Sequence, residues 1–226
     1  MGSQLIQLII LAGVAVFLIL RLRSVIGTRQ GYEGNPEDYG ISQRGKADDS
    51  SDDRSFEVIE GGGIDEDIAD HVETDSDAGQ ALAAMKRIEP SFSVGEFLGG
   101  ARGAYEMILM SYEHGDLDTL EQFLAPDVFS GFRQAVEARD EQGLTVEARF
   151  VGVSEMKLKD ARFDDLDNVA DITIRFVGEM SSVVKNGDGE IVEGDPNAVK
   201  KQSDTWTFSR VMGSDNPNWL LVATGA

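Results

Sequence analysis

Apolar residues along this chain follow three successive patterns: a continuous run, a helical period and an alternation. The continuous run extends from Leu5 to Leu20 and is interrupted only by Gln7. A helix of this length spans roughly 24 Å, and the apolar residues just beyond it extend the span toward the ~30 Å hydrocarbon core of a bilayer. We therefore predict a transmembrane anchor over residues 1–27.

The charges beside this run predict its orientation. Arg21, Arg23 and Arg29 follow it, whereas no Lys or Arg precedes it, so the positive-inside rule places everything after residue 23 on the cytoplasmic side. A cleaved signal peptide would carry its positive charge before the run and a small-x-small site after it, and the segment shows neither. The residues expected to hold the anchor in the bilayer are Leu5, Ile9, Leu11, Phe17, Leu20, Arg21 and Arg23.

The helical period starts near Ser93. Ser93 and Glu96 have the spacing of a capping box, in which the hydroxyl serves the third amide and the glutamate reaches back. From Phe97 to Tyr112, apolar residues then recur at three- and four-residue steps, which indicates one amphipathic helix. Gly115 follows it as a typical C-terminal stop.

Two shorter helices are expected next. The capping pattern that starts at Asp118 predicts a short helix, which Pro126 ends. Pro126 also suits the first turn of a third helix, which ends just before Gly143. A weaker helical segment, Ala81 to Ile88, precedes all three.

Beyond residue 144 the period changes to two. Residues 171–180 alternate, with Ile172, Ile174 and Phe176 on one face and polar residues on the other, as in a half-buried strand. Strands are expected at 146–158, 171–180, 205–211 and 219–224. Helices followed by antiparallel strands predict an α+β fold of cystatin- or NTF-two-like type, with the helices on one face of a curved four-stranded sheet and a pocket between the layers.

Aromatic and aliphatic residues on the inward faces are candidates for lining that pocket. They are Phe97, Tyr105, Ile108, Phe132, Phe176, Trp206, Phe208 and Trp219. The simplest interpretation of the three on the last two strands is core packing or cross-strand pairing, and a ligand-lining role is the alternative. Arg175 and Arg210 would either close the mouth of the pocket or pair with neighbouring acids.

Composition separates the anchor from the folded part. Residues 28–80 hold sixteen acidic and four basic residues with few large apolar ones, and such a stretch cannot bury enough apolar surface to offset its chain entropy. We therefore expect an acidic disordered linker over residues 28–89 and a folded domain over residues 90–226.

Charge and residue usage exclude several function classes. The chain carries a net charge of −21, of which −11 falls in residues 81–226, so nucleic acid is not expected as a partner. No cysteine is present, which excludes disulfides, thiol nucleophiles and thiolate metal sites.

Candidate catalytic and metal-binding residues are few. His71 and His114 are the two histidines, and a terminal position like that of His114 commonly complements a helix dipole. The acidic run of residues 65–70 lacks the oxygen spacing of a calcium loop, and Asp164, Asp165 and Asp167 suit a solvated turn. We expect no catalytic residues, no metal site, no cofactor and no enzymatic activity.

Together these features resemble a known family. The residues that carry the resemblance are Phe97, Ala101, Tyr105 and Ile108, then Gly115-Asp116, Phe132, Arg139 and Gly143, and finally Asp204–Arg210 and Asn218-Trp219-x-Leu221. Together with the anchor and the acidic linker that precede them, these residues make the chain similar to the bacterial TimA proteins. Those proteins belong to the Tim44-like domain family and are relatives of the Tim44 subunit of the mitochondrial presequence translocase.

The resemblance implies adaptor work in protein translocation or membrane protein assembly. It implies a domain with an apolar pocket, a single-pass location in the bacterial inner membrane with the domain in the cytoplasm, and a protein partner such as a translocase subunit or a DnaK-type chaperone. A mitochondrial inner membrane location on the matrix side is the alternative. The chain lacks the targeting segment and the long basic helical region of the mitochondrial pattern. As an alternative function, the domain would act as a receptor for a small ligand or a lipid, or as an enzyme. Self-association is left open.

Overall fold

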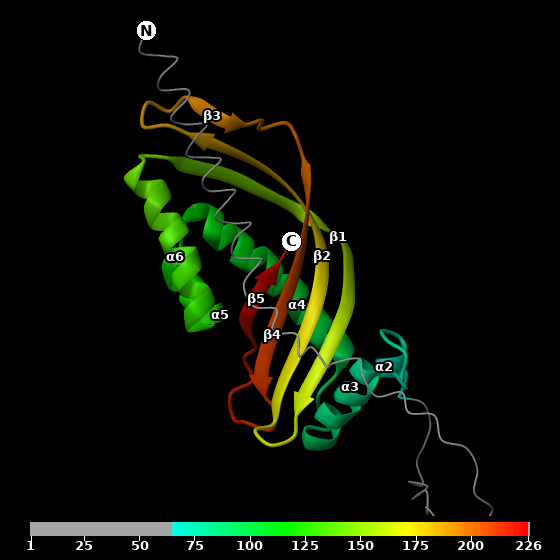
Figure 1. The fold of residues 1–226 in the computed structure, drawn as a ribbon. Helices are drawn as coiled ribbons and strands as arrows, with labels where there is room; N and C mark the ends of the chain where they lie inside the picture. Colours follow the sequence, from blue (N-terminus) through cyan, green and yellow to red (C-terminus); the bar gives the residue numbers. More distant parts are fainter. Residues whose placement is uncertain (1–64, 226) are drawn as a thin grey trace, which may run out of the picture. The chain divides into compact units, whose positions relative to one another are not determined.

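The computed structural model describes residues 65–225. The predicted anchor, its residues, and the predicted linker up to residue 64 lie outside the described residues. The helices are α2 (Glu66–Ala69), α3 (Asp77–Ile88), α4 (Val94–His114), α5 (Leu117–Phe123) and α6 (Pro126–Glu141), and the strands are β1 (Thr145–Asp164), β2 (Val169–Lys185), β3 (Ile191–Gly194), β4 (Lys200–Val211) and β5 (Leu220–Gly225). Within residues 65–225 the helices thus precede the strands, which confirms the predicted α+β class (Figure 1).

The sheet is antiparallel and has five strands rather than the predicted four. Its order is β1-β2-β4-β5, and β3 pairs with the end of β2 beyond the stretch that β4 occupies. The sequence pattern missed β3 because the strand has only four residues and all of them are exposed, so no alternation marks it.

Strand β1 forms one edge of the sheet. It is twenty residues long, and its register against β2 shifts at three places, between Phe150 and Gly152, between Val153 and Glu155, and between Leu158 and Asp160. Each shift is typical of a bulge, which adds an unpaired residue and bends the strand locally.

Local signals predicted the bounds of α4 correctly. The Ser93 hydroxyl accepts a hydrogen bond from the Glu96 backbone N–H at 3.3 Å, and Gly115 adopts a left-handed conformation with φ 73° after the last turn. A left-handed φ at this position favours glycine because a Cβ would be strained there. The prediction for α5 was two residues off, since Asp116 rather than Asp118 is the capping residue.

The folded unit starts earlier than predicted. Residues 65–89, which were expected to belong to the disordered linker, form α2 and α3, and the weak helical segment at Ala81–Ile88 is the larger part of α3. Ile68, Leu82 and Met85 are buried in the core. The composition of this segment is acidic, but a few apolar side chains at helical spacing are enough to attach it to the domain.

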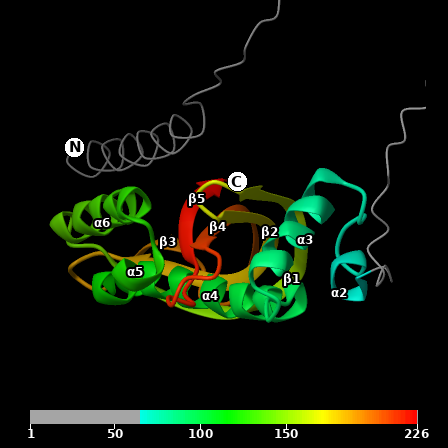
Figure 2. The ribbon, with the colours of Figure 1, turned by 90° about the horizontal axis from the view of Figure 1, so that it is seen from below.

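Helix α4 packs along the sheet and carries the largest share of the buried helical residues. The α2–α3 pair and the α5–α6 pair lie toward opposite ends of α4 (Figures 1 and 2). The strand faces toward α4 supply the other half of the core, including Leu158, Ile172, Ile174 and Leu221.

Candidate functional site

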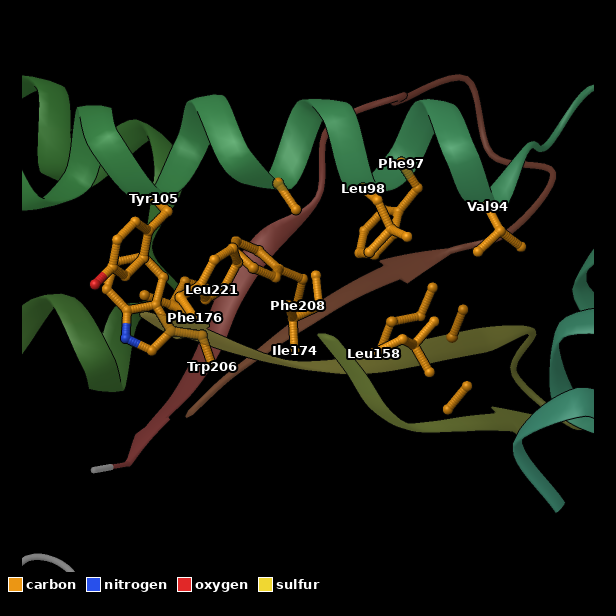
Figure 3. Packing of buried hydrophobic residues seen from close by; sticks show 14 of the residues in the cluster. Val94, Phe97, Leu98, Tyr105, Leu158, Ile174, Phe176, Trp206, Phe208 and Leu221 are labelled. Carbon is orange, nitrogen blue, oxygen red and sulfur yellow. The ribbon is translucent and has the colours of Figure 1, made fainter. Parts of the chain in front are cut away.

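The eight predicted lining residues lie in the layer between α4 and the sheet or at its margin. Six of them are buried, namely Phe97, Tyr105, Ile108, Phe176, Trp206 and Phe208, and Phe132 and Trp219 are partly buried against the same core. The side chains of α4 point toward those of the strands (Figure 3). The structure therefore brings these residues together as packing partners, apart from Phe132, and their role as a ligand lining stays a prediction.

The rings form two groups along α4, which meet where Trp206 lies 6.2 Å from Phe208. In one group, Tyr105 stacks on Phe176 with a centroid distance of 4.4 Å and contacts Trp206 at 4.7 Å. In the other, Phe97 lies 4.6 Å from Trp219 and 6.2 Å from Phe208. Phe132 is separate, because its ring pairs with Tyr112 rather than with the lining residues. Aromatic pairs at these separations add to the stability that burial alone provides.

A polar group is buried among these rings. The Tyr105 hydroxyl, on a side chain that is 0% exposed, donates a hydrogen bond to Asp204 Oδ2 at 2.6 Å. The Gln202 amide donates to both carboxylate oxygens, at 2.9 and 3.1 Å. Because burial and the neighbouring carboxylate both disfavour the phenolate, the pKa of Tyr105 is raised far above its ordinary value.

Gly178 makes room for this hydroxyl. A Cβ built at Gly178 would lie 2.7 Å from the Tyr105 oxygen, closer than van der Waals contact allows. The absence of a side chain on β2 at this point lets the phenol reach Asp204 on the neighbouring strand. The position shows how a glycine within a strand permits close approach of another group.

Arg210 lies at one end of the aromatic layer. Its guanidinium forms an ion pair with Glu89, next to the C-terminal end of α3, and lies 5.5 Å from the centre of the Trp219 ring. The Gly213 N–H also donates to Glu89, at 3.0 Å. The hydrogen bond from Arg210 holds the pKa of Glu89 below its usual range. Of the two interpretations for the arginines, pairing is what the structure shows, since Arg175 pairs with Glu155 at 2.7 Å.

A shallow hollow lies on another part of the surface. It is lined by Gly103, Glu106, Met107, Met110, Ser111, His114 and Asp116. His114 is therefore at the surface near the end of α4, and Asp116 is engaged as the cap of α5 through the Thr119 N–H at 3.1 Å.

Residues 65–225 present neither a metal-binding cluster nor a membrane-spanning helix. No group of three or more His, Cys, Asp or Glu side chains there has the geometry of a metal site. In the same range no helix has both the length and the apolarity to cross a bilayer. The acidic run at 65–70 is not simply solvated, because Asp65 and Asp67 both pair with Lys86.

Three positions that shape these contacts, two carboxylates and one glycine, were not predicted. Asp204 was missed although it precedes Trp206 and Phe208 at two-residue steps, so a carboxylate on the apolar face was a usable signal. Gly178 gave a similar signal between Phe176 and Met180. Asp67 gave none, since its partners at residues 93–95 are more than twenty positions away.

Comparison with protein families gives one match that covers most of the described chain. The Tim44-like domain matches residues 78–226. These residues include α3 through β5 and both aromatic groups.

Individual relatives are translocase subunits. The chain is 25% identical over 150 residues to the human mitochondrial import inner membrane translocase subunit TIM44, a match that covers 65% of this chain and 33% of the human protein. It is 22% identical over 178 residues to the probable mitochondrial import inner membrane translocase subunit tin-44 of Caenorhabditis elegans, covering 77% of this chain and 41% of that protein. The chain therefore spans about a third to two fifths of the length of the curated relatives it matches.

Among solved structures, the intermembrane space region of the chloroplast protein ARC6 gives a TM-score of 0.39 at 12% identity, covering 57% of this chain and 94% of that one. A likeness at this level carries no argument about function.

Proposed function

The chain belongs to the Tim44-like domain family, and on that premise we propose that it is an inner-membrane adaptor whose folded domain binds a protein partner in protein translocation or membrane protein assembly. The observation that carries the proposal is the match of the Tim44-like domain to residues 78–226. Relatives named as translocase subunits of the mitochondrial inner membrane support it.

The structure supports binding rather than catalysis. In the described part of the chain, the one hydroxyl–carboxylate pair in the core, Tyr105 and Asp204, is buried and engaged in hydrogen bonds. An enzyme is expected to place titratable groups where a substrate can reach them. We therefore assign the domain's activity to its surface, and the net charge of −11 over residues 81–226 favours basic or amphipathic polypeptide segments as partners.

Membrane attachment is the second part of the proposal. Residues 1–27 would span the bilayer, and the acidic stretch before residue 65 would connect the anchor to the domain. A tethered domain reaches an effective concentration on the order of millimolar near its anchor, so weak contacts with a translocase subunit or a DnaK-type chaperone are sufficient. We propose a bacterial TimA-type protein with the domain in the cytoplasm, and the names of the relatives support the alternative of the mitochondrial inner membrane with the domain in the matrix.

Site-specific photo-crosslinking in intact membranes tests this function. A photoreactive amino acid is placed at exposed Met107, with buried Ile174 as the matched control. We expect crosslinks to translocase subunits or to a DnaK-type chaperone from position 107 only. Recovery of neither class from exposed positions on several elements would contradict the proposal.

A further inference from the structure

Asp67 connects three helices at the N-terminal edge of the folded unit. Its carboxylate accepts hydrogen bonds from the backbone N–H of Val94 at 2.8 Å and of Gly95 at 2.9 Å, and from the Ser93 hydroxyl at 3.1 Å. Lys86 of α3 lies 2.7 Å from the same carboxylate. One side chain of α2 thus satisfies free amides at the start of α4 and pairs with α3.

The residue beside it provides the apolar part of the attachment. Ile68 is 2% exposed and belongs to the core that also contains Leu82, Met85 and Val94. Asp65 adds a second contact to Lys86, at 2.9 Å. The attachment of α2 therefore consists of two ion pairs to one lysine, three hydrogen bonds to one helix end and one buried side chain.

These contacts are strong individually but few. Burial by itself would raise the pKa of Asp67, yet the hydrogen bonds from Lys86, Gly95, Val94 and Ser93 hold it far below its usual range, so the carboxylate is charged at neutral pH. Helix α2 has only four residues, and its N-cap Asp65 makes no side-chain capping bond. A helix this short has no stability of its own in water, so α2 stays in place through tertiary contacts, chiefly those of Asp65, Asp67 and Ile68. Val72, just after the helix, packs partly buried against the same core.

Helix α3 is attached independently. Leu82 and Met85 are fully buried, and Glu89 at its C-terminal end pairs with Arg210 of β4. Turns at residues 70–76 separate α2 from α3. Nothing in the contacts of α3 with the sheet requires Asp67 to stay at the start of α4.

We propose that α2 is a releasable clasp: Asp67 and Ile68 detach together from the start of α4 while residues 77–225 stay folded. Release frees residues 65–76 from the domain. This lengthens the segment before the domain by at most about 40 Å of extended backbone. The opening itself does not depend on the proposed function. The consequence of the opening does depend on the proposed function, because in a membrane-tethered adaptor a closed clasp holds the domain nearer the anchor and an open clasp lets it reach farther.

Hydrogen exchange measured by mass spectrometry on the full chain in detergent tests the clasp. Asp67→Asn removes the charge at constant size, and Asp70→Asn is the matched control, since Asp70 lies on the exposed side of the same segment and makes none of these contacts. We expect Asp67→Asn to speed exchange at least tenfold in peptides covering 65–72 and in the first amides of α4, with β2 and β4 unchanged. Ile68→Ala is expected to reproduce this pattern.

Two results would overturn the proposal that α2 is a releasable clasp. One is exchange over 65–72 in Asp67→Asn and Ile68→Ala that equals the wild type. The other is faster exchange in β2 and β4 together with α2, which would make α2 part of the global unfolding unit. The measurement needs neither a membrane nor a partner, so its failure would leave the adaptor function untouched, and failure of the crosslinking experiment would leave the clasp untouched.

Discussion

Asp204 and Asp67 are both carboxylates held by several hydrogen bonds, but one lies inside the aromatic layer and the other at the edge of the fold. Asp204 is 5% exposed, and its donors are the side chains of Tyr105 and Gln202. The side chain of Asp67 is 28% exposed, and its donors are backbone amides, a serine hydroxyl and a lysine. The first carboxylate depends on two neutral side chains, whereas the second is held by a helix end and a cation.

The contrast between the two carboxylates indicates where the stability of this fold is concentrated. A buried group that loses a hydrogen-bond partner is left with the cost of its desolvation, and Asp204 is almost fully shielded from bulk water. At the edge, water can replace a lost donor of Asp67. Breaking the inner network should therefore destabilise the whole domain, and breaking the outer one should open a local segment.

The largest effect is expected from Tyr105→Ala. The substitution removes a fully buried ring that stacks on Phe176 and leaves Asp204 with Gln202 as its donor. Loss of a large buried aromatic side chain costs about 3–5 kcal/mol. Urea unfolding followed by fluorescence measures it, and a loss below 1 kcal/mol would show that the inner region is not the more cooperative of the two.

Tyr105→Phe isolates the hydrogen bond. We expect a loss of about 1–3 kcal/mol, because the buried carboxylate keeps only the Gln202 donor. The double variant Tyr105→Phe, Asp204→Leu should recover part of that loss, since it removes both polar partners. A double variant less stable than both single variants would contradict this account of the network.

Asp67→Asn should have a smaller effect on the global free energy of unfolding. The substitution weakens a cap of α4, and loss of a helix cap costs about 1 kcal/mol. Urea unfolding of this variant and of Asp70→Asn gives the comparison directly. A loss for Asp67→Asn as large as that for Tyr105→Ala would remove the distinction between the two regions.

The outer region is expected to lose stability toward acidic pH and the inner region toward alkaline pH. The pKa values of Asp67 and Glu89 are lowered in the fold, so their contribution is present above about pH 4 and is lost as the pH falls through the folded values. The pKa of Tyr105 is raised, so the unfolded chain ionises first and stability falls above about pH 10. We expect Asp67→Asn to flatten the acid limb and Tyr105→Phe to flatten the alkaline limb. Thermal unfolding at several pH values measures both limbs.

Local chemistry made much of the fold predictable. The bounds of α4 and α6 follow from Ser93, Gly115 and Pro126, whose effects act within one turn of the helix. The α+β class follows from the change of period near residue 144. β3 could not be predicted, because four exposed residues carry no pattern.

The candidate site was predictable in one respect only. Periodicity showed correctly that Tyr105, Phe176 and Trp206 face inward, but it does not say whether side chains or a ligand fill the space between them. Partners distant in sequence, such as Asp67 and Val94, depend on the tertiary path of the chain. An acidic composition at residues 65–80 therefore suggested disorder where a few long-range contacts give order.

The three register shifts of β1 also bear on how this protein behaves at high local density. An edge strand of twenty residues with regular spacing would present a continuous template for recruiting strands from other copies. The shifts divide that edge into short stretches, and exposed charged side chains such as Lys157 and Arg162 lie within them. An edge interrupted in this way is a poor template for strand addition by another copy of the chain.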